Sequence, residues 1–241
     1  MAQIRIFTPE DIFKDKVINL SKENYHYLVN VMRKNVGDQI NIFNESCGEW
    51  DAFIIKIKKS ISVKVKFLKR KPINQQDIWL CFGMTKSKKV KFLVEKVTEI
   101  GVSKIVPINT EFSEKIKMNV DKMRRVVIEA TEQSNQINLP RIEFNVNLEI
   151  FVKNLTDDRL VILCDENLKS PNILDFLSKN TLKKLAVLIG PVGGWSEKDR
   201  FYLNELKNLY PVSLGSSVFK MDTASIFSVA CCKIFMENLN E

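Results

Sequence analysis

Short segments in the first 72 residues carry the β-branched and aromatic residues that are typical of β-strands. Turn signals such as the stretch 44–48 separate them, so we expect five strands, at 5–7, 16–20, 39–44, 50–57 and 62–68. Ser21 can cap one helix, which would end near Asn35. The apolar face of this helix, at helical spacing, would consist of Tyr25, Leu28, Val31 and Met32. Short strands with a single helix predict a compact β-barrel in residues 1–72.

After residue 72 the pattern changes to strands that alternate with helices. We expect strands at 78–82, 105–107, 142–144, 160–164, 186–189 and 210–214. The expected helices span 90–100, 121–134 and about 196–208, with Ser196 as the cap of the third, and Asp222 caps a terminal helix. This alternation predicts an α/β domain at 73–241, with a largely parallel sheet and helices on both faces. Ligands bind such sheets beyond the carboxyl ends of the strands.

Two loops follow predicted strands at that edge. The loop 190–196 (GPVGGWS) holds three of the chain's eight glycines, and the loop 215–224 (GSSVFKMDTA) also leads into a helix. Glycine lets a ligand approach the backbone closely, so a strand, a glycine loop and a helix N-terminus can form a nucleotide site. A tight turn without a ligand is the alternative. Neither G-x-x-x-x-G-K-[ST] nor G-x-G-x-x-G occurs, which argues against ATP hydrolysis and the usual dinucleotide fold.

Composition narrows the class of protein. Of the 241 residues 45% are hydrophobic and 27% are charged, and the 8 glycines and 7 prolines are few, so the chain is not a disordered one. No apolar run reaches the roughly 20 residues that cross a bilayer. Acidic residues stand where a signal peptide would need an apolar core, so we expect a cytoplasmic protein.

The formal charge of +8 is unevenly distributed. Residues 1–72 hold 14 basic and 8 acidic residues, whereas residues 73–241 hold 23 and 21. A basic surplus favours a polyanionic partner, because neutralised phosphates release counterions. Solvated surface lysines without a partner are the alternative.

Cysteine and histidine limit the possible chemistry. The five cysteines have no C-x-x-C spacing, and His26 is the only histidine. We therefore expect neither a zinc site nor a Ser-His-Asp triad. All five cysteines are expected to be ordinary buried thiols: Cys47, Cys81, Cys164, Cys231 and Cys232.

Five segments resemble the motifs of one family in their order and spacing. IGPVGGWSEKD at 189–199 and VSLGSSVFKMDTAS at 212–225 resemble the C-terminal signature of the RsmE family of SPOUT enzymes, the small-subunit ribosomal RNA uridine-N3 methyltransferases. KSKKVKFLVEKVTEIGVSKIVPINTEFS at 86–113, IEATEQSNQINLP at 128–140 and YHYLVNVMRKNVGDQINIFN at 25–44 resemble further segments of that family. The resemblance spans nearly the whole chain.

This resemblance implies a fold and a cofactor. The expected fold is an N-terminal PUA-like β-barrel for RNA docking and a C-terminal SPOUT α/β domain with a trefoil knot, in a homodimer without a membrane segment or a metal. S-adenosylmethionine would lie between the two loops. By position, the residues that would bind it are Gly190, Gly193, Gly194, Leu214, Gly215 and Val218. Cation candidates for RNA binding are Arg33, Lys86, Lys88, Lys89, Arg124 and Arg125, with Lys34 and Lys91 beside them.

Methyl transfer to uracil N3 needs little from the protein beyond alignment and handling of one proton, because the cofactor carries the leaving group. Asp222 could accept the N3 proton, and Lys220 could stabilise the developing negative charge on oxygen. The alternative is that Asp222 caps the helix and Lys220 contacts a phosphate.

The chain departs from the family pattern at four positions. Val192 replaces a Glu, Lys220 an Arg, Asp222 a Glu and Gln136 an Arg. Lysine keeps the charge of arginine without its planar fork. These changes leave two other functions open: a SPOUT methyltransferase for another nucleotide or a ribose 2′-oxygen, and an RNA-binding or ribosome-assembly protein whose active site has eroded. The intact glycines of both loops argue against erosion.

Overall fold

The computed structural model describes residues 4–165, 170–180 and 183–238 and divides them into two compact units. The N-terminal unit comprises the described residues up to Asn74 together with Thr131–Leu139. The C-terminal unit comprises Gln75–Ala130 and the described residues from Pro140 onward. Residues 131–139 therefore interrupt the second unit in the sequence and belong to the first in space.

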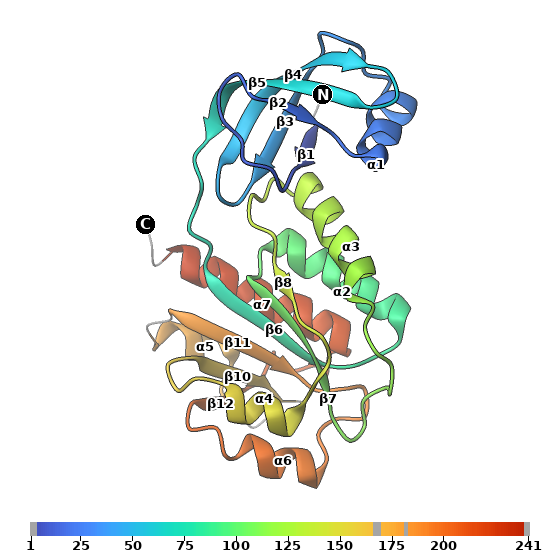
Figure 1. Cartoon of the computed structure of the whole chain (residues 1–241). Coiled ribbons are helices and arrows are strands. Elements are labelled where there is room, and N and C mark those ends of the chain that lie inside the picture. The colour runs from blue at the N-terminus through green and yellow to red at the C-terminus, as the bar shows by residue number, and fades with distance from the viewer. Residues whose placement is uncertain (1–3, 166–169, 181–182, 239–241) are drawn as a thin grey trace. The chain divides into compact units, whose positions relative to one another are not determined.

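The N-terminal unit is built on a curled sheet of five strands (Figure 1). The strands are β1 (Arg5–Phe7), β2 (Val17–Asn19), β3 (Gln39–Asn44), β4 (Gly48–Ile57) and β5 (Ile61–Arg70). Their order is β1-β3-β4-β5-β2, in which β1 runs parallel to β3 and the other pairs are antiparallel. All five predicted strands are confirmed, with ends that move by a few residues at most.

Alternation along these strands gives the N-terminal unit its core. One face buries a compact aliphatic cluster, in which Ile6, Ile18, Ile40, Ile42 and Val63 have no exposed surface. Successive side chains of a strand point to opposite faces, so this cluster fixes which residues of β3, β4 and β5 face away from it.

The predicted helix of this unit differs from the structure. It begins at Ser21 as expected, whose side chain accepts from Asn24 N, but after α1 (Lys22–Tyr25) it becomes a π-helix, η1 (His26–Val31). Met32 N donates to Tyr27 O, five residues back. This wider turn shifts the later residues off the expected apolar face. Leu28 is fully buried as predicted, but Val31 and Met32 are 56% and 39% exposed.

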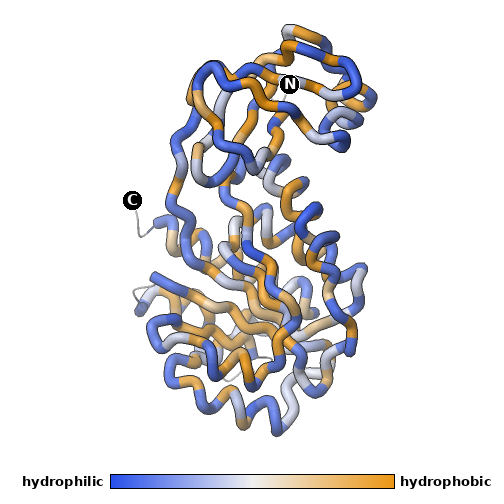
Figure 2. The backbone as a smooth tube through the Cα atoms, viewed as in Figure 1, coloured by the Kyte–Doolittle hydropathy of each residue, from blue (hydrophilic) through white to orange (hydrophobic). Residues whose placement is uncertain are grey.

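The C-terminal unit contains a seven-stranded sheet in which every pair of neighbours is parallel. The strands are β6 (Asp77–Gly83), β7 (Lys104–Asn109), β8 (Arg141–Ile142), β9 (Val146–Asn147), β10 (Leu160–Cys164), β11 (Lys184–Ile189) and β12 (Leu209–Val212). Their order is β12-β10-β11-β6-β7-β8, with β9 also on β7. The parallel sheet is confirmed. Figure 2 shows the hydrophobic character of its central strands, which are buried on both faces.

Helices cover both faces of this sheet, as predicted. The helix α7 (Met221–Asn238) packs on β6 and β11 and contacts α2 (Ser87–Ile100) and α5 (Ile173–Ser178). On the other face α4 (Leu148–Asn154) packs on β7 and contacts α6 (Glu197–Leu203) (Figure 1). The remaining helix, α3 (Val120–Gln133), passes from one unit into the other.

Several boundaries in this unit correct the sequence-based expectations. Phe144 lies outside β8 and is 74% exposed, and α6 ends at Leu203, short of the expected residue 208. Two short helices, α4 and α5, were not predicted, because six or seven residues carry too little periodicity to show a helical pattern.

Asp222 is not the cap of the terminal helix. The helix begins at Met221, and Ala224 N donates to Lys220 O at 2.8 Å, so Asp222 lies in the first turn. Its Oδ1 accepts from Thr223 N at 3.1 Å. A carboxylate in the first turn still interacts favourably with the helix dipole.

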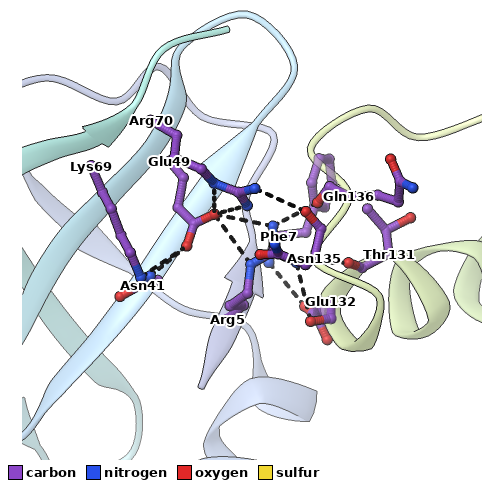
Figure 3. Close-up of polar contacts among 10 residues, drawn as sticks. All are labelled: Arg5, Phe7, Asn41, Glu49, Lys69, Arg70, Thr131, Glu132, Asn135 and Gln136. Atoms are coloured by element: carbon purple, nitrogen blue, oxygen red, sulfur yellow. Dashed lines mark hydrogen bonds and ion pairs between the residues drawn. The ribbon is translucent and has the colours of Figure 1, made fainter. Parts of the chain in front are cut away.

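A buried charged cluster ties residues 131–136 to the N-terminal sheet (Figure 3). The Arg5 guanidinium donates to the carbonyl oxygens of Thr131 (2.9 Å), Glu132 (3.2 Å) and Gln136 (2.6 Å), and its Nε donates to Glu49 Oε2 at 3.2 Å. The first two carbonyls belong to the last turn of α3, where a cation also favours the helix dipole. Arg5 therefore acts as a C-terminal cap for α3.

Glu49 balances the arginines of this cluster. Its side chain is 1% exposed, accepts from Asn41 Nδ2 and forms an ion pair with Arg70. Burial favours a higher pKa for Glu49, but the hydrogen bonds from Asn41 and Arg70 and the charges of Arg5 and Arg70 outweigh it, so its pKa is lowered. Glu49 is therefore a buried carboxylate that stays ionised.

Candidate functional site

A cavity of about 350 Å³ opens at the carboxyl ends of three strands in the C-terminal unit. Its wall contains the ends of β10 and β11, residues 190–192 and 194–195 of the first loop, residues 214 and 217–220 after β12, and the first turn of α7. This is the edge at which open parallel sheets bind ligands, and the volume suits a small organic molecule.

Glycines in and around the first loop allow its close packing. A Cβ on Gly190 would lie 3.0 Å from Trp195 Nε1, and one on Gly193 would lie 3.0 Å from the Cβ of Phe112. At the end of β6, a Cβ on Gly83 would lie only 2.5 Å from the backbone nitrogen of Pro191. The loop thus lies directly against β6 and the residues after β7, and side chains at these positions would displace it.

The helix after this loop is fixed by a capping box. Ser196 Oγ accepts from Asp199 N at 3.0 Å, and the Asp199 carboxylate accepts from Ser196 N at 3.1 Å. The same carboxylate accepts from Glu111 N at 3.3 Å. Ser196 is confirmed as the predicted cap. Asp199, which is 4% exposed, also joins the start of α6 to the loop that carries Phe112.

The second loop turns sharply at Gly215, which has φ of +124°. Ser213 Oγ donates to Gly215 O at 3.0 Å and accepts from Gly215 N at 3.3 Å. A Cβ on Gly215 would meet nothing within 4 Å, so it is the backbone conformation that requires glycine here.

The wall of the cavity combines apolar side chains with a few charges. Ile189, Leu214, Val218 and Met221 provide an apolar surface, and Lys89, Asp165 and Lys220 are its charged members. Cys164 also contributes, but burial raises the pKa of its thiol to about 12, so the thiol stays protonated and is a poor nucleophile. The described residues of the wall can therefore hold a ligand that has both an apolar ring and charged groups.

Two family models match the chain. The model described as an RNA methyltransferase domain covers residues 72–233, and one described as an RNA methyltransferase PUA domain covers residues 20–67. The chain belongs to this RNA methyltransferase family. The family resemblance found in the sequence is thereby confirmed, and so is the expectation of an enzyme.

Two named relatives match the methyltransferase over nearly its whole length. The ribosomal RNA small subunit methyltransferase E of Rickettsia conorii is 28% identical over 244 residues, which cover 100% of this chain and 99% of that protein. The protein of the same name from Bacillus subtilis is 26% identical, with 92% of each chain covered.

Solved structures share the fold of the methyltransferase. A Legionella pneumophila methyltransferase in complex with bound SAM has a TM-score of 0.86 and 24% identity, covering 97% of this chain and 98% of that one. The ribosomal RNA small subunit methyltransferase E of Neisseria gonorrhoeae, bound to S-adenosyl methionine, has a TM-score of 0.83 and 19% identity, covering 99% and 98%.

The structure brings together most of the cofactor-binding residues proposed for the methyltransferase. Four of the six line the cavity, namely Gly190, Gly194, Leu214 and Val218. Gly193 and Gly215 lie in the same two loops outside the cavity wall. Of the two catalytic candidates, Lys220 lines the cavity, whereas Asp222 is half-buried in the first turn of α7 and lies outside the wall.

The RNA-binding candidates are dispersed. Arg33 is exposed in the N-terminal unit with φ of +53°. Lys86 and Lys88 are exposed at the start of α2, and Arg124 and Arg125 are exposed on α3. Lys89 is half-buried and lines the cavity, which favours a role toward a bound ligand over one on an open RNA surface.

Sequence reasoning missed three contributors to the site: Gly83, Asp165 and Trp195. Gly83 and Asp165 each come at the carboxyl end of a strand, which is a signal that could have found them. Trp195 follows directly on the paired glycines, but its packing over Gly190 is visible only in three dimensions.

The structure also bears on the predictions about metal sites, membrane spans and cysteines. Among the described residues no three His, Cys, Asp or Glu side chains gather as a metal site, and no helix is long and apolar enough to span a membrane. The five cysteines form no disulfide, but only Cys81 and Cys232 are fully buried. The prediction of five buried thiols was therefore too broad, because Cys47, Cys164 and Cys231 are partly exposed.

Proposed function

We propose that the methyltransferase transfers the methyl group of S-adenosylmethionine to N3 of a uridine in 16S small-subunit ribosomal RNA, position 1498 by family resemblance. The observation that carries this proposal is the cavity at the carboxyl ends of β10, β11 and β12, enclosed by the two loops that match the family signature. The names of the relatives support the class of RNA.

The residues of the cavity fit this cofactor. The apolar surface of Leu214 and Val218 suits the adenine, and the backbone of the two loops lines the cavity at residues 190–192, 194–195, 214 and 217–220, where it can meet the ring nitrogens and the ribose. The amino acid part of the cofactor carries an ammonium group and a carboxylate. In the cavity wall, Asp165 can pair with the ammonium group and Lys89 or Lys220 with the carboxylate. When bound, S-adenosylmethionine supplies the methyl group and a sulfonium leaving group.

The protein's part in the reaction is to align the base and to manage one proton. Asp222 accepts the N3 proton of uracil or a hydrogen bond from it, and Lys220 stabilises the negative charge that develops on the neighbouring oxygen. Lys220 lies in the cavity wall, two residues before Asp222 at the start of α7. Asp222 is not a cap in the structure, so the carboxylate is not committed to that structural role.

We also infer a closed PUA-like barrel, a trefoil knot in the SPOUT domain, a homodimer and a cytoplasmic location. The functional division is residues 1–72 for RNA docking and 73–241 for cofactor binding and catalysis. The family models at 20–67 and 72–233 and the basic surplus of residues 1–72 support this division.

The test is mass mapping of 16S ribosomal RNA from cells that lack the gene, with the gene restored as control. Loss of one 3-methyluridine is expected, and an unchanged signal would refute the proposal. In vitro, Asp222→Asn should lower the rate of methyl transfer by a factor on the order of 10² or more while cofactor affinity and folding stay normal. Full activity of this variant would remove Asp222 as proton acceptor. Absence of S-adenosylmethionine binding by the unmodified protein would instead indicate an eroded site.

A further inference from the structure

A phenylalanine on the N-terminal sheet faces solvent because the strand that carries it is bulged. Phe67 of β5 is 62% exposed. In the pairing of β5 with β4, Val65 lies opposite Ala52 and Phe67 lies opposite Asp51, so one extra residue, Lys66, is inserted in β5. A β-bulge of this kind redirects the side chains that follow it. Without the bulge, Phe67 would face the core together with Val65.

The register shows which side chains share the outward face with Phe67. Ala52 and Val65 have no exposed surface and belong to the core side, so Asp51 and its partner Phe67 lie on the other side. Phe53, two residues along β4, lies on this same outward face. Its partner Lys64 is paired in turn with Val17 of β2. Val17 is 48% exposed and Phe53 is half-buried. We call Val17, Phe53, Lys64, Lys66 and Phe67 the outer face.

The lysines of the outer face lie beside two acids. Lys64 Nζ and Lys66 Nζ lie 3.3 and 3.7 Å from the same Asp15 carboxylate oxygen, and Asp51 lies on this side of the sheet opposite Phe67. The hydrogen bond from Asp15 N to Val65 O, 3.0 Å, places the turn that holds Asp15 beside β5. The positive charge that attracts a polyanion comes from residues 1–72 as a whole, which hold 14 basic and 8 acidic residues.

Exposed rings beside lysines are the combination that single-stranded RNA requires. Its unpaired bases stack on aromatic side chains, and its phosphates lie beside cations. A double helix would hide its base faces. Residues 1–72 carry a basic surplus, so a second copy of this unit would bring like charges together.

We propose that the outer face binds a single-stranded stretch of the RNA substrate, with a base stacked on Phe67 and phosphates beside Lys64 and Lys66. This inference rests on the proposed function, because it assumes an RNA substrate. It adds a docking surface on the N-terminal unit, made of residues other than the cations predicted from the sequence. The bulge at Lys66 is the structural device that presents the ring.

The experiment measures RNA affinity by fluorescence anisotropy with the full chain. The probes are 16S ribosomal RNA transcript and a fluorescein-labelled single strand of about 16 nucleotides, the upper end of known site sizes for small single-strand-binding domains. Phe67→Ala should weaken binding roughly 5- to 100-fold, the range for loss of one stacked base. Phe67→Leu should weaken it similarly and Phe67→Trp should retain it, because stacking requires a ring. Phe144→Ala is the matched control, since Phe144 is 74% exposed but lies in the C-terminal unit.

The contribution of the lysines is measured separately, by the salt dependence of RNA binding. Lys64→Gln with Lys66→Gln should lower the slope of log affinity against log salt by about 0.7 for each phosphate that the lysines neutralise in the unmodified protein. Asp15→Asn should have the opposite effect on affinity, because it leaves both lysines to the RNA. An unchanged slope in the lysine variant would contradict the phosphate contacts.

Failure of this inference can be distinguished from failure of the proposed function. If the unmodified protein binds S-adenosylmethionine and methylates the RNA while Phe67→Ala binds RNA normally, the outer face is not a docking surface and the function still holds. If Phe67→Leu binds as well as the unmodified protein, base stacking is refuted. If Phe67→Ala changes only the sedimentation of the protein, a second copy covers the outer face and the proposal is wrong. Cofactor affinity should be the same in all these variants.

Discussion

The Glu49 cluster of the N-terminal unit and the cavity of the C-terminal unit place their charged side chains differently. In the N-terminal unit, Glu49 is enclosed by Arg5, Arg70 and Asn41, and the remaining donors of Arg5 are directed to backbone carbonyls. In the C-terminal unit, Lys89, Asp165 and Lys220 face a cavity instead. Charges that satisfy one another inside the protein hold its parts together, whereas charges around a cavity are placed to meet a ligand.

The difference predicts which substitutions affect stability and which affect ligand binding. Changes in the Glu49 cluster should lower the free energy of unfolding of the N-terminal unit with no effect on cofactor affinity. Changes around the cavity should lower cofactor affinity with no effect on the free energy of unfolding. Any variant that moves both quantities together would break this division.

Glu49→Ala should have the largest effect. It leaves Arg5, which is 8% exposed, as a buried charge without its carboxylate, and breaking a buried pair typically costs about 3–5 kcal/mol. Urea unfolding followed by the fluorescence of Trp50 in this unit measures the loss. The double variant Arg5→Met with Glu49→Leu should regain part of the stability, because neither charge is then left buried. A single variant as stable as the unmodified protein would show that the cluster is not a structural centre.

Gly83→Ala should weaken cofactor binding by at least tenfold. The new Cβ would lie 2.5 Å from Pro191 N, so the first loop, whose Pro191 lines the cavity, must shift. Calorimetric titration with S-adenosylmethionine measures the change. Gly37→Ala is the control, because its Cβ would meet nothing within 4 Å and Gly37 belongs to the N-terminal unit. The positive φ of Gly37, +95°, should lower its stability by about 1 kcal/mol and leave cofactor affinity unchanged. Equal affinities of both variants would contradict the role of Gly83.

These two sites differ in how far the sequence could predict them. The strands and the two loops of the cavity follow from local patterns, because alternation and glycine spacing act over a few residues. The Glu49 cluster joins Arg5, Glu49 and Gln136, and no local pattern connects positions 44 and 87 residues apart. The π-helical turn after Tyr25 was not predicted for a different reason. A spacing of 3.6 residues per turn assumes a regular α-helix, whereas the chain forms a π-helix there.

Gln136 shows how the structure changes the meaning of a motif. The sequence suggested that loss of an arginine at this position removes a cation from the RNA side. In the structure the backbone carbonyl of Gln136 accepts from Arg5, so position 136 also has a structural role, which its backbone provides. This role comes in addition to the loss of the arginine's positive charge.

Acid should destabilise the N-terminal unit through Glu49. The pKa of Glu49 is lowered in the folded protein from an ordinary value of 4.5, so its contribution is complete above about pH 4.5 and is lost as the pH falls toward the folded value. The free energy of unfolding should thus be steady near neutral pH and fall below pH 4.5. In Glu49→Gln this part of the pH dependence should disappear. A variant with the same acid profile as the unmodified protein would assign the effect to other carboxyls of this unit, such as Asp15, whose pKa is lowered by its hydrogen bond with Lys64.

Asp165→Asn should have the smallest effect and should be confined to the cavity. Among the described residues that line the cavity, Asp165 is the one acid, so it is the group that can pair with the α-ammonium of the cofactor. We expect affinity for S-adenosylmethionine to fall about fivefold, roughly 1 kcal/mol. Affinity for methylthioadenosine, which lacks the amino acid part, should stay the same. Asp222→Asn, outside the cavity wall, is the control and should alter neither affinity. Equal losses for both ligands in Asp165→Asn would mean that Asp165 supports the shape of the cavity, and the division between structural and ligand-directed charge would then fail at this residue.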